Sequence, residues 1–342
     1  MSGRVMGSCW PAPSPGIRLV SSMQGSGGRA DSAGRAIAGE AAMSAAIGKP
    51  AGRVPLVLLA AGLVLALLAT GCSRQKLVVY MTAPLIETSL DETFASADLQ
   101  TVEEALPGEI LLLRGLCGSD PGNRDLWTTT VQLYASFALL FVGPEDPQWA
   151  EDLYREGKDL GLRFLKREEW FAEAWNAGPD RLREVLRERR PERLAPLCAW
   201  TAACLGEYIL MNQDRPAEML DLPYVHVLLD TAIELDPGYF HGLPYAMKGV
   251  MLATVPQGLG GNLVDANRYF EQAIAVSGGK FLLFRVFRAR YYLAGALDQE
   301  GFVQALQEVL ATPVDLAPEI RLVNQLARRR AVSLLAEQDE LF

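Results

Sequence analysis

Cys72 is the residue whose surroundings most clearly predict a chemical reaction. It follows an uninterrupted apolar run, Val54–Leu68, which is preceded by Lys49 and Arg53, and it closes the tetrapeptide Ala69-Thr70-Gly71-Cys72. A positive segment, an apolar run and small residues occur in this order in secretory signal peptides. The terminal tetrapeptide fits a bacterial lipobox, in which the cysteine thiol accepts diacylglycerol and cleavage makes that cysteine the new N-terminus. The sequence therefore predicts lipidation at Cys72.

The predicted signal peptide occupies residues 43–71 and begins at Met43. The alternative is a buried helix that ends in a cysteine, and the apolar run is too short to cross a bilayer comfortably, which takes about 20 residues. Residues 1–42 are rich in Gly, Ser and Ala, so they are predicted to be disordered or to result from a misassigned start. Ser73 after the acylated position favours export to the outer membrane.

The remaining composition indicates a folded protein without an evident catalytic or metal centre. The chain has 342 residues, of which 50% are hydrophobic, and contains 32 basic and 41 acidic side chains. An acidic balance argues against nucleic-acid binding and against electrostatic attachment to anionic lipid, so the acyl chains would hold the protein on a membrane. The only two histidines are His226 and His241, which leaves little material for a histidine-based site.

Two segments resemble cofactor-binding motifs but lack a residue that the motif requires. The segment 258–263 lacks the last glycine of a dinucleotide fingerprint, and Ser277-Gly278-Gly279-Lys280 lacks the first glycine of a phosphate loop, which favours a helix C-cap there. Cys117, Cys198 and Cys204 show no zinc spacing and are predicted to be small buried side chains. We expect no cofactor, no metal and no enzymatic activity, and a periplasmic hydrolase with an unrecognised site is disfavoured.

Helical periodicity dominates the chain after the signal, and strand alternation is almost absent. The Ala266, Phe270 and Ala273 spacing matches the core of the second helix of a tetratricopeptide (TPR) repeat, and Ala150, Tyr154 and Gly157 repeat it. We therefore predict an all-α fold, specifically a degenerate TPR-like α-solenoid of antiparallel helix hairpins over residues 101–342. Residues 72–100 are predicted to be a linker and first helix, and a generic helical bundle is the alternative.

A repeat register of this kind predicts which side chains face a groove. In TPR scaffolds the first helices line the concave face, and the predicted groove is mixed apolar and polar, which suits an amphiphilic acid or a partner helix. The alternative for each of the side chains in this groove, and for the neighbouring Leu205, is burial in the core. The predicted groove residues are Thr128, Gln132, Ser136, Thr201, Tyr208, His241, Lys248, Met251, Arg285 and Tyr292.

Two arginine-rich stretches, residues 181–193 and 328–330, are predicted to lie on surface helices. In the first stretch the interspersed glutamates favour ion pairs along the helix, with i,i+4 spacing. The alternative for both stretches is docking of an acidic partner.

Several short motifs in order resemble one known family, the TPR-containing periplasmic T component associated with TRAP transporters. The resemblance covers residues 102–342 and rests on Ala105-Leu106-Pro107, Leu235-Asp236-Pro237 with His241-Gly242, Gly260-Gly261, Tyr269–Ile274, Ser277–Lys280, and Asn324 to Arg329 running on to Leu341-Phe342. It implies an all-helical, lipid-anchored periplasmic protein that forms a homotrimer. It also implies binding to the TRAP solute-binding protein and transfer of small apolar or organic-acid ligands.

These observations together predict a lipid-anchored periplasmic TPR adaptor of a TRAP-type uptake system, placed at the outer membrane. Its expected partners are the TRAP solute-binding protein, a small organic or apolar ligand, the membrane through its acylated N-terminus and other copies of itself, but no nucleic acid. The alternative function is a TPR lipoprotein that scaffolds an envelope or secretion complex.

Overall fold

The structure, a computed structural model, describes residue 86 and residues 88–143 and 145–342. The chain divides into two compact units, and all described residues belong to the unit that contains residues 75–342. The predictions for residues 1–42, for the signal peptide at 43–71 and for Cys72 fall outside the described residues.

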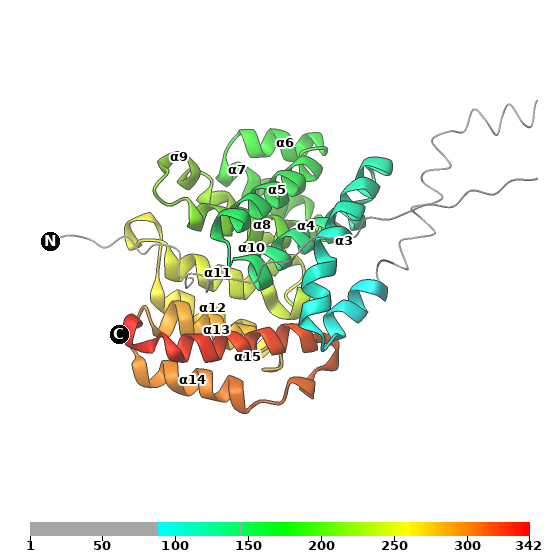
Figure 1. Cartoon of the computed structure of the whole chain (residues 1–342). Coiled ribbons are helices and arrows are strands. Elements are labelled where there is room, and N and C mark those ends of the chain that lie inside the picture. Colours follow the sequence, from blue (N-terminus) through cyan, green and yellow to red (C-terminus); the bar gives the residue numbers. More distant parts are fainter. Residues whose placement is uncertain (1–85, 87, 144) are drawn as a thin grey trace, which may run out of the picture. The chain divides into compact units, whose positions relative to one another are not determined.

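The described part of the chain is helical and contains no strand, so the predicted all-α class is confirmed. A short helical segment at residues 88–95 precedes the labelled helices, which Figure 1 shows packed together. The α-helices are α3 (Leu99–Ser119), α4 (Arg124–Phe137), α5 (Pro147–Leu165), α6 (Glu169–Asn176), α7 (Pro179–Arg189), α8 (Ala195–Met211), α9 (Pro216–Met219), α10 (Leu222–Leu235), α11 (Leu243–Thr254), α12 (Leu263–Val276), α13 (Leu283–Phe287), α14 (Gln299–Ala311), α15 (Arg321–Ala336) and α16 (Gln338–Leu341).

Seven further helical segments, all within the described residues, join or extend these helices. Two of them are π-helices, η1 (Ala138–Val142) and η5 (Arg288–Leu293), which continue α4 and α13 with wider turns. The others are the 3₁₀ segments η2 (Glu192–Leu194), η3 (Tyr239–Gly242), η4 (Gln257–Leu259), η6 (Val314–Leu316) and η7 (Pro318–Ile320).

Polar side chains and glycines set the helix boundaries. A side-chain oxygen accepts a hydrogen bond from a first-turn backbone N–H at the starts of α3, α4, α5, α12 and α14, which partners donors that the helix itself leaves unpaired. The residues that do so are Asp98, Asn123, Asp146, Asn262 and Asp298. Segments that contain Pro or Gly, at residues 120–123, 236–238, 256–261 and 277–279, lie between α-helices.

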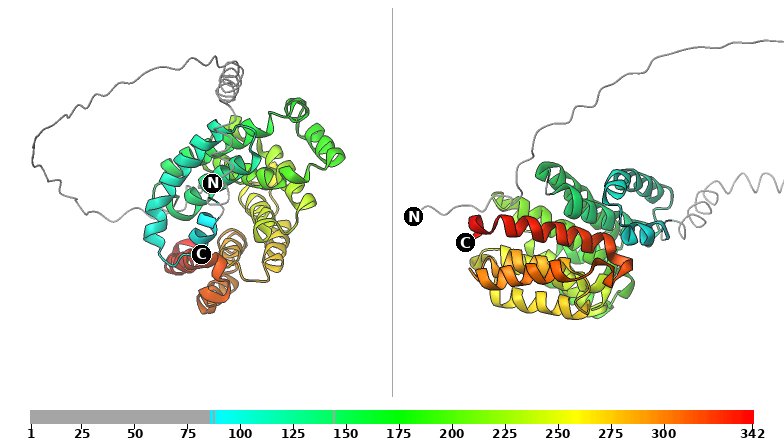
Figure 2. Two further views of the ribbon diagram at one scale, coloured as in Figure 1. Left: turned by 90° about the vertical axis from the view of Figure 1, so that its right-hand side faces the viewer. Right: turned by 60° about the horizontal axis from the view of Figure 1, so that its bottom comes forward.

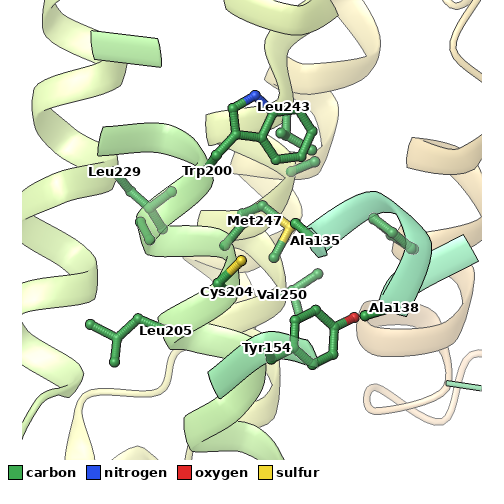
Figure 3. Close-up of a cluster of buried hydrophobic side chains, with 14 of the residues drawn as sticks. Ala135, Ala138, Tyr154, Trp200, Cys204, Leu205, Leu229, Leu243, Met247 and Val250 are labelled. Carbon is green, nitrogen blue, oxygen red and sulfur yellow. The ribbon is translucent and has the colours of Figure 1, made fainter. Parts of the chain in front are cut away.

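Helices α5 and α8 pack unusually close together because two glycines of α5 face α8. A Cβ atom at Gly157 would lie 2.6 Å from Cys204 Sγ, and one at Gly161 would lie 2.1 Å from Thr201 Oγ1. This contact explains why Gly157 stands where the repeat pattern favours alanine. Figure 3 shows Tyr154 and Cys204 within the same buried apolar cluster, beside Met247 and Val250 of α11.

The α11 and α12 pair follows the expected small–aromatic pattern. Ala266, Phe270 and Ala273 of α12 are all fully buried. The ring of Phe270 lies against Gly249 of α11, where an added Cβ would approach it to 2.9 Å. The side chains identified from the sequence as helix-packing residues therefore do pack between helices.

Helix α15 brings the C-terminal end of the unit back to its beginning. Arg321 Nη1 donates to the carbonyl of Ala95, 3.3 Å away, and Arg330 Nη2 donates to the carbonyl of Leu139 in η1. The left view of Figure 2 shows α15, in red, near the early helices in cyan. Residues more than 190 positions apart in the sequence are thus in direct contact.

One stretch in the described part of the chain, Glu192–Met211, is long and apolar enough to span a membrane. Most of this stretch is buried within the protein, and it includes α8, which packs against α4, α5 and α10. Helix α8 is therefore a core helix of this unit.

Candidate functional site

Six of the ten predicted groove residues are buried. Thr201 and Met251 have no exposed surface, and Thr201 occupies the close contact between α5 and α8. Thr128 donates a hydrogen bond to the carbonyl of Arg124 on its own helix. The buried set is Thr128, Ser136, Thr201, Tyr208, Lys248 and Met251, and Leu205 is buried as well.

Lys248 differs from the other buried residues because it carries a charge. Its ammonium group forms an ion pair with Asp230 of α10 and lies 5.0 Å from the centre of the Tyr269 ring. Burial lowers the pKa of Lys248 to about 8. The neighbouring His226, in contrast, is neutral at pH 7, because burial lowers its pKa to about 4. Lys248 therefore already has a carboxylate partner within the protein.

Gln132, His241, Arg285 and Tyr292 are the four predicted groove residues that retain accessible surface. Arg285 forms an ion pair with Glu308 of α14 at 3.0 Å, and the guanidinium of Arg288 lies over the Tyr292 ring. Arg285 and Glu308 also line a small surface cavity of about 230 Å³. Gln132 is on α4 and His241 is on η3, whereas Arg285 and Tyr292 lie on the continuous stretch of α13 and η5, so the four residues come from three separate parts of the chain.

His241 lies in a strained segment. Phe240, His241 and Gly242 all adopt positive φ angles, of 42°, 60° and 94°. Two consecutive non-glycine residues in this region are costly, at roughly 1–2 kcal/mol each. The Phe240 ring is held at the centre of an aromatic cluster and contacts Phe94 at 5.8 Å, Trp200 at 4.9 Å and Phe281 at 6.0 Å between centroids. Burial lowers the pKa of His241, which favours the neutral ring.

A cluster of four polar side chains was not identified from the sequence. We call Tyr154 of α5, Glu207 of α8, Tyr291 of η5 and Arg330 of α15 the polar cluster, because Tyr154 and Arg330 each interact electrostatically with the other three. Burial raises the pKa of Glu207 to about 7, against the opposing effect of Arg330. Burial also raises the pKa of the Tyr154 phenol and lowers that of Arg330.

Side chains of the polar cluster keep a partial route to solvent. Glu207, Tyr291 and Arg330 are half-buried, whereas Tyr154 is buried. Figure 3 shows the Tyr154 hydroxyl pointing away from Cys204 and toward the backbone near Ala138, the first residue of η1. The sequence gives no signal of the polar cluster, because its four members come from four separate helical elements. Glu207, for example, is a single acidic residue on the apolar helix α8.

The arginine-rich stretches are only partly surface features. On α7, Arg181 and Arg183 pair with Glu184 and Asp180 at i,i+3 spacing, where the sequence suggested i,i+4 pairs. Arg187 instead crosses to Glu234 of α10. In the second stretch Arg329 is exposed, but Arg330 is directed inward to the polar cluster. The prediction of a wholly surface position for residues 328–330 is therefore wrong for Arg330.

The remaining chemical motifs have structural roles. Cys117, Cys198 and Cys204 are free, buried thiols, as expected, and burial raises the pKa of Cys198 to about 12. The Ser277–Lys280 segment ends α12, with Gly278 and Gly279 at positive φ, which confirms the predicted helix C-cap. Within the described ranges no group of three or more His, Cys, Asp or Glu side chains could hold a metal ion.

Comparison with known proteins identifies the family. Residues 95–342 match the family model described as TRAP transporter T-component. The chain is also 25% identical over 309 residues to an uncharacterized protein of Treponema pallidum (strain Nichols), and the alignment covers 81% of this chain and 94% of that protein.

The T components are accessory proteins of a transporter and not an enzyme family, and membership implies association with a TRAP transporter system in the cell envelope. Because the family model spans most of the chain, the all-helical unit described above belongs to the TRAP transporter T-component family.

Proposed function

We propose that this protein is a non-catalytic, lipid-anchored periplasmic adaptor that binds the solute-binding protein of a TRAP transporter and a small organic ligand. The observation that carries the proposal is the family match over residues 95–342 of a unit built from packed helices. Helical repeats offer extended surfaces on which a partner or ligand binds, and they do so without catalytic groups.

The proposed scaffold is a degenerate TPR-like solenoid. Small residues at close helix contacts support it, since glycines in α5 face α8 and Gly249 of α11 faces Phe270 of α12. Pro121 and Gly278 lie two residues after the ends of α3 and α12, where a proline or glycine would end a repeat. Repeat architectures bury their apolar faces against neighbouring pairs in this way.

The proposed groove for the partner uses the four accessible positions Gln132, His241, Arg285 and Tyr292. We propose that partner binding depends on Arg285, whose charge would engage a carboxylate of the solute-binding protein at the cost of its exposed pair with Glu308. Exposed ion pairs contribute only about 0–1 kcal/mol, so such an exchange is energetically easy.

Co-purification tests the adaptor role. The tagged mature chain should retain the TRAP solute-binding protein of the same organism under mild conditions, and Arg285→Glu should weaken that retention. Arg187→Glu is the matched control, because Arg187 also forms one exposed ion pair, with Glu234 at 2.9 Å. Absence of any complex with the wild-type chain would overturn the proposal.

The proposed anchor is a diacylglycerol-modified Cys72 at the outer membrane. Metabolic labelling with palmitate should mark the wild-type chain and leave Cys72→Ser unlabelled, and sucrose-gradient fractionation should place the labelled chain with outer-membrane markers. The proposed homotrimer predicts three times the chain mass in light scattering. A label that persists in Cys72→Ser would contradict the proposed site.

Gene deletion separates the adaptor from the alternative scaffold for envelope or secretion complexes. The adaptor predicts loss of uptake of one solute, restored by the wild-type gene, with the envelope intact. Defects in envelope assembly with normal solute uptake would support the scaffold instead.

A further inference from the structure

We propose that the turn between η5 and α14, residues 294–298, docks the solute-binding protein of the transporter, and that the Leu297 side chain inserts into an apolar pocket of that partner. Arg285, which lines a cavity beside this turn, supplies the charged part of the same contact. The inference deepens the partner-binding role proposed above and rests on it, because it names the surface through which the partner binds.

Leu297 occupies a backbone position that glycine usually fills. It lies in a Schellman motif at the end of η5, where the chain must adopt a left-handed conformation. Asp298 N donates to Leu293 O at 2.9 Å, which is one hydrogen bond of the motif. Leu297 N donates to Ala294 O at 3.1 Å, which is the other. Leu297 has a φ angle of 58°, and a side chain is strained in this conformation whereas glycine is not.

The end of α12 forms the same motif with a glycine at the equivalent position. Gly279 N donates to Ile274 O at 2.8 Å. Gly278 N donates to Ala275 O at 3.0 Å, so Gly278 corresponds to Leu297. Its φ angle is 59°, which nearly equals that of Leu297. The chain therefore uses glycine for this backbone geometry at the end of α12 and keeps a strained leucine at the end of η5.

Packing within the protein does not compensate for the strain at Leu297, because this residue is 73% exposed. Strained residues persist only where the surrounding structure maintains them, and they are concentrated at ligand clamps and other functional sites. An exposed apolar side chain in a costly conformation is explained if a partner buries it.

The start of α12 extends the apolar surface around the turn. A Cβ atom at Gly295 would lie 3.4 Å from Leu263 Cδ2, so the turn lies beside the first residue of α12. The next residue, Val264, is 79% exposed, and Leu259 in the loop before α12 is 56% exposed. We call Leu259, Val264 and Leu297 the apolar corner. Exposed apolar patches with a polar rim mark surfaces for protein contact.

A charged cavity adjoins the apolar corner. The cavity of about 230 Å³ is lined in part by Leu293 and Asp298, which bracket the turn, and by Arg285. Arg285 pairs with Glu308 at 3.0 Å, but the two side chains are 32% and 49% exposed. Because exposed pairs of this kind are weak, a partner carboxylate can replace Glu308 while apolar contacts form at Leu297. Protein interfaces combine an apolar centre with a polar rim in this way.

The charges around the apolar corner favour a protein partner over a lipid surface. Asp298 and Glu300 follow Leu297 in the chain and are exposed. Arg268 of α12 is paired with Asp265 at 3.0 Å. Anionic lipid head groups attract clusters of basic residues and repel carboxylates. A folded protein, in contrast, offers an apolar pocket and a carboxylate at fixed positions.

The affinity of the mature chain for the purified solute-binding protein, measured by biolayer interferometry, tests this surface. Leu297→Gly should weaken binding by at least about tenfold, as expected for a central apolar contact. The same substitution relieves the strain and stabilises the free protein, so weaker binding cannot result from misfolding. Leu220→Gly is the matched control, because Leu220 is 74% exposed with an unstrained φ angle of −64°. This control should leave the affinity unchanged.

Further variants separate the effect of the side chain from that of the backbone. Leu297→Asn introduces a residue that tolerates the left-handed conformation but is polar, so it should weaken binding as Leu297→Gly does. Leu297→Met keeps an apolar side chain of similar volume and should bind within about twofold of wild type. Val264→Ser should weaken binding several-fold, because Val264 belongs to the same apolar corner.

Wild-type affinity in both Leu297→Gly and Leu297→Asn would overturn the docking surface and leave the adaptor role intact. Absence of any complex with the wild-type chain would overturn the adaptor role and this inference with it.

Two other results would show a different occupant and refute the inference, if affinity for the solute-binding protein were unchanged. The first is a smaller assembly of Leu297→Gly in light scattering, which would indicate a second copy of the chain. The second is loss of binding to phosphatidylglycerol vesicles by Leu297→Gly, measured together with Cys72→Ser so that no acyl chain contributes.

Discussion

Gly161 of α5 lies directly against Thr201 of α8, so closely that a Cβ atom at position 161 would come within 2.1 Å of the threonine Oγ1. Thr201 is fully buried and its hydroxyl has no hydrogen-bond partner. The absence of a side chain at Gly161 therefore sets how near the two helices can approach.

Gly161→Ala should destabilise the protein because the new methyl group forces α5 and α8 apart. Overpacking of this kind costs about 1–3 kcal/mol. Urea denaturation followed by circular dichroism measures the loss, and Thr201→Ala should restore part of it. The control is Gly115→Ala on the exposed face of α3, where an added Cβ would meet no neighbouring atom within 4 Å. This substitution should stabilise the protein by up to about 1 kcal/mol. Equal effects of the two substitutions would contradict this account.

Glu207→Gln should remove part of the pH dependence of stability. Because the pKa of Glu207 in the folded protein is raised to about 7, above its ordinary value of 4.5, its ionisation lowers stability as the pH rises from about 4.5 to about 7. The contribution is of order 1–3 kcal/mol. Urea midpoints at pH 5 and pH 8 should show the variant more stable than wild type only at pH 8. The same difference at both pH values would rule out an ionisation effect.

Leu297→Gly should raise stability. Leu297 is 73% exposed and has a φ angle of 58°, a region in which a side chain is strained and glycine is not. We expect a gain of up to about 1 kcal/mol, measured as an increase in the melting temperature. Leu220→Gly is the matched control, because Leu220 is 74% exposed but has a φ angle of −64°, and this substitution should lower stability.

Asn324→Ala should be strongly destabilising although it removes only a small side chain. Fully buried Asn324 accepts a hydrogen bond from Leu282 N at 3.0 Å and donates one to Lys280 O at 3.0 Å, which fastens the segment after α12 to α15. Its loss leaves two backbone groups unpaired, at about 1–3 kcal/mol each. Chemical denaturation should show this loss, and the neighbouring Gln325→Ala should cost much less. A value below about 1 kcal/mol would argue against this role.

The helices and their breaks could be predicted because the signals are local. Periodic apolar residues and the Pro and Gly residues at 120–123, 236–238 and 277–279 act over a few positions, so the sequence contains them directly. The buried cysteines and the small–aromatic spacing of Ala266 and Phe270 were predictable for the same reason. The order of the short motifs along the chain also resembles the family that the family model matches.

The surroundings of individual candidate side chains were harder to predict because they are formed by distant segments. Arg330 stands in a run of three arginines that reads as solvent-exposed, and only the packing of α15 against η1 turns it inward. Thr201 and Met251 fall on the predicted groove by register, yet the glycine-mediated contact and the α11 packing bury them. The π-helices likewise have no local signature in the apolar residues of α4 or α13.

The return of α15 has a consequence for how the chain reaches its final form. Its contacts with Leu139 and Ala95 join residues separated by 191 and 226 positions. Contacts so remote in sequence form late and slowly, because a long loop must close before they are made. Helix α15 must therefore be complete before the two ends of the unit can be fastened together, and chains truncated ahead of Arg321 would leave the earlier helices without their closing partner.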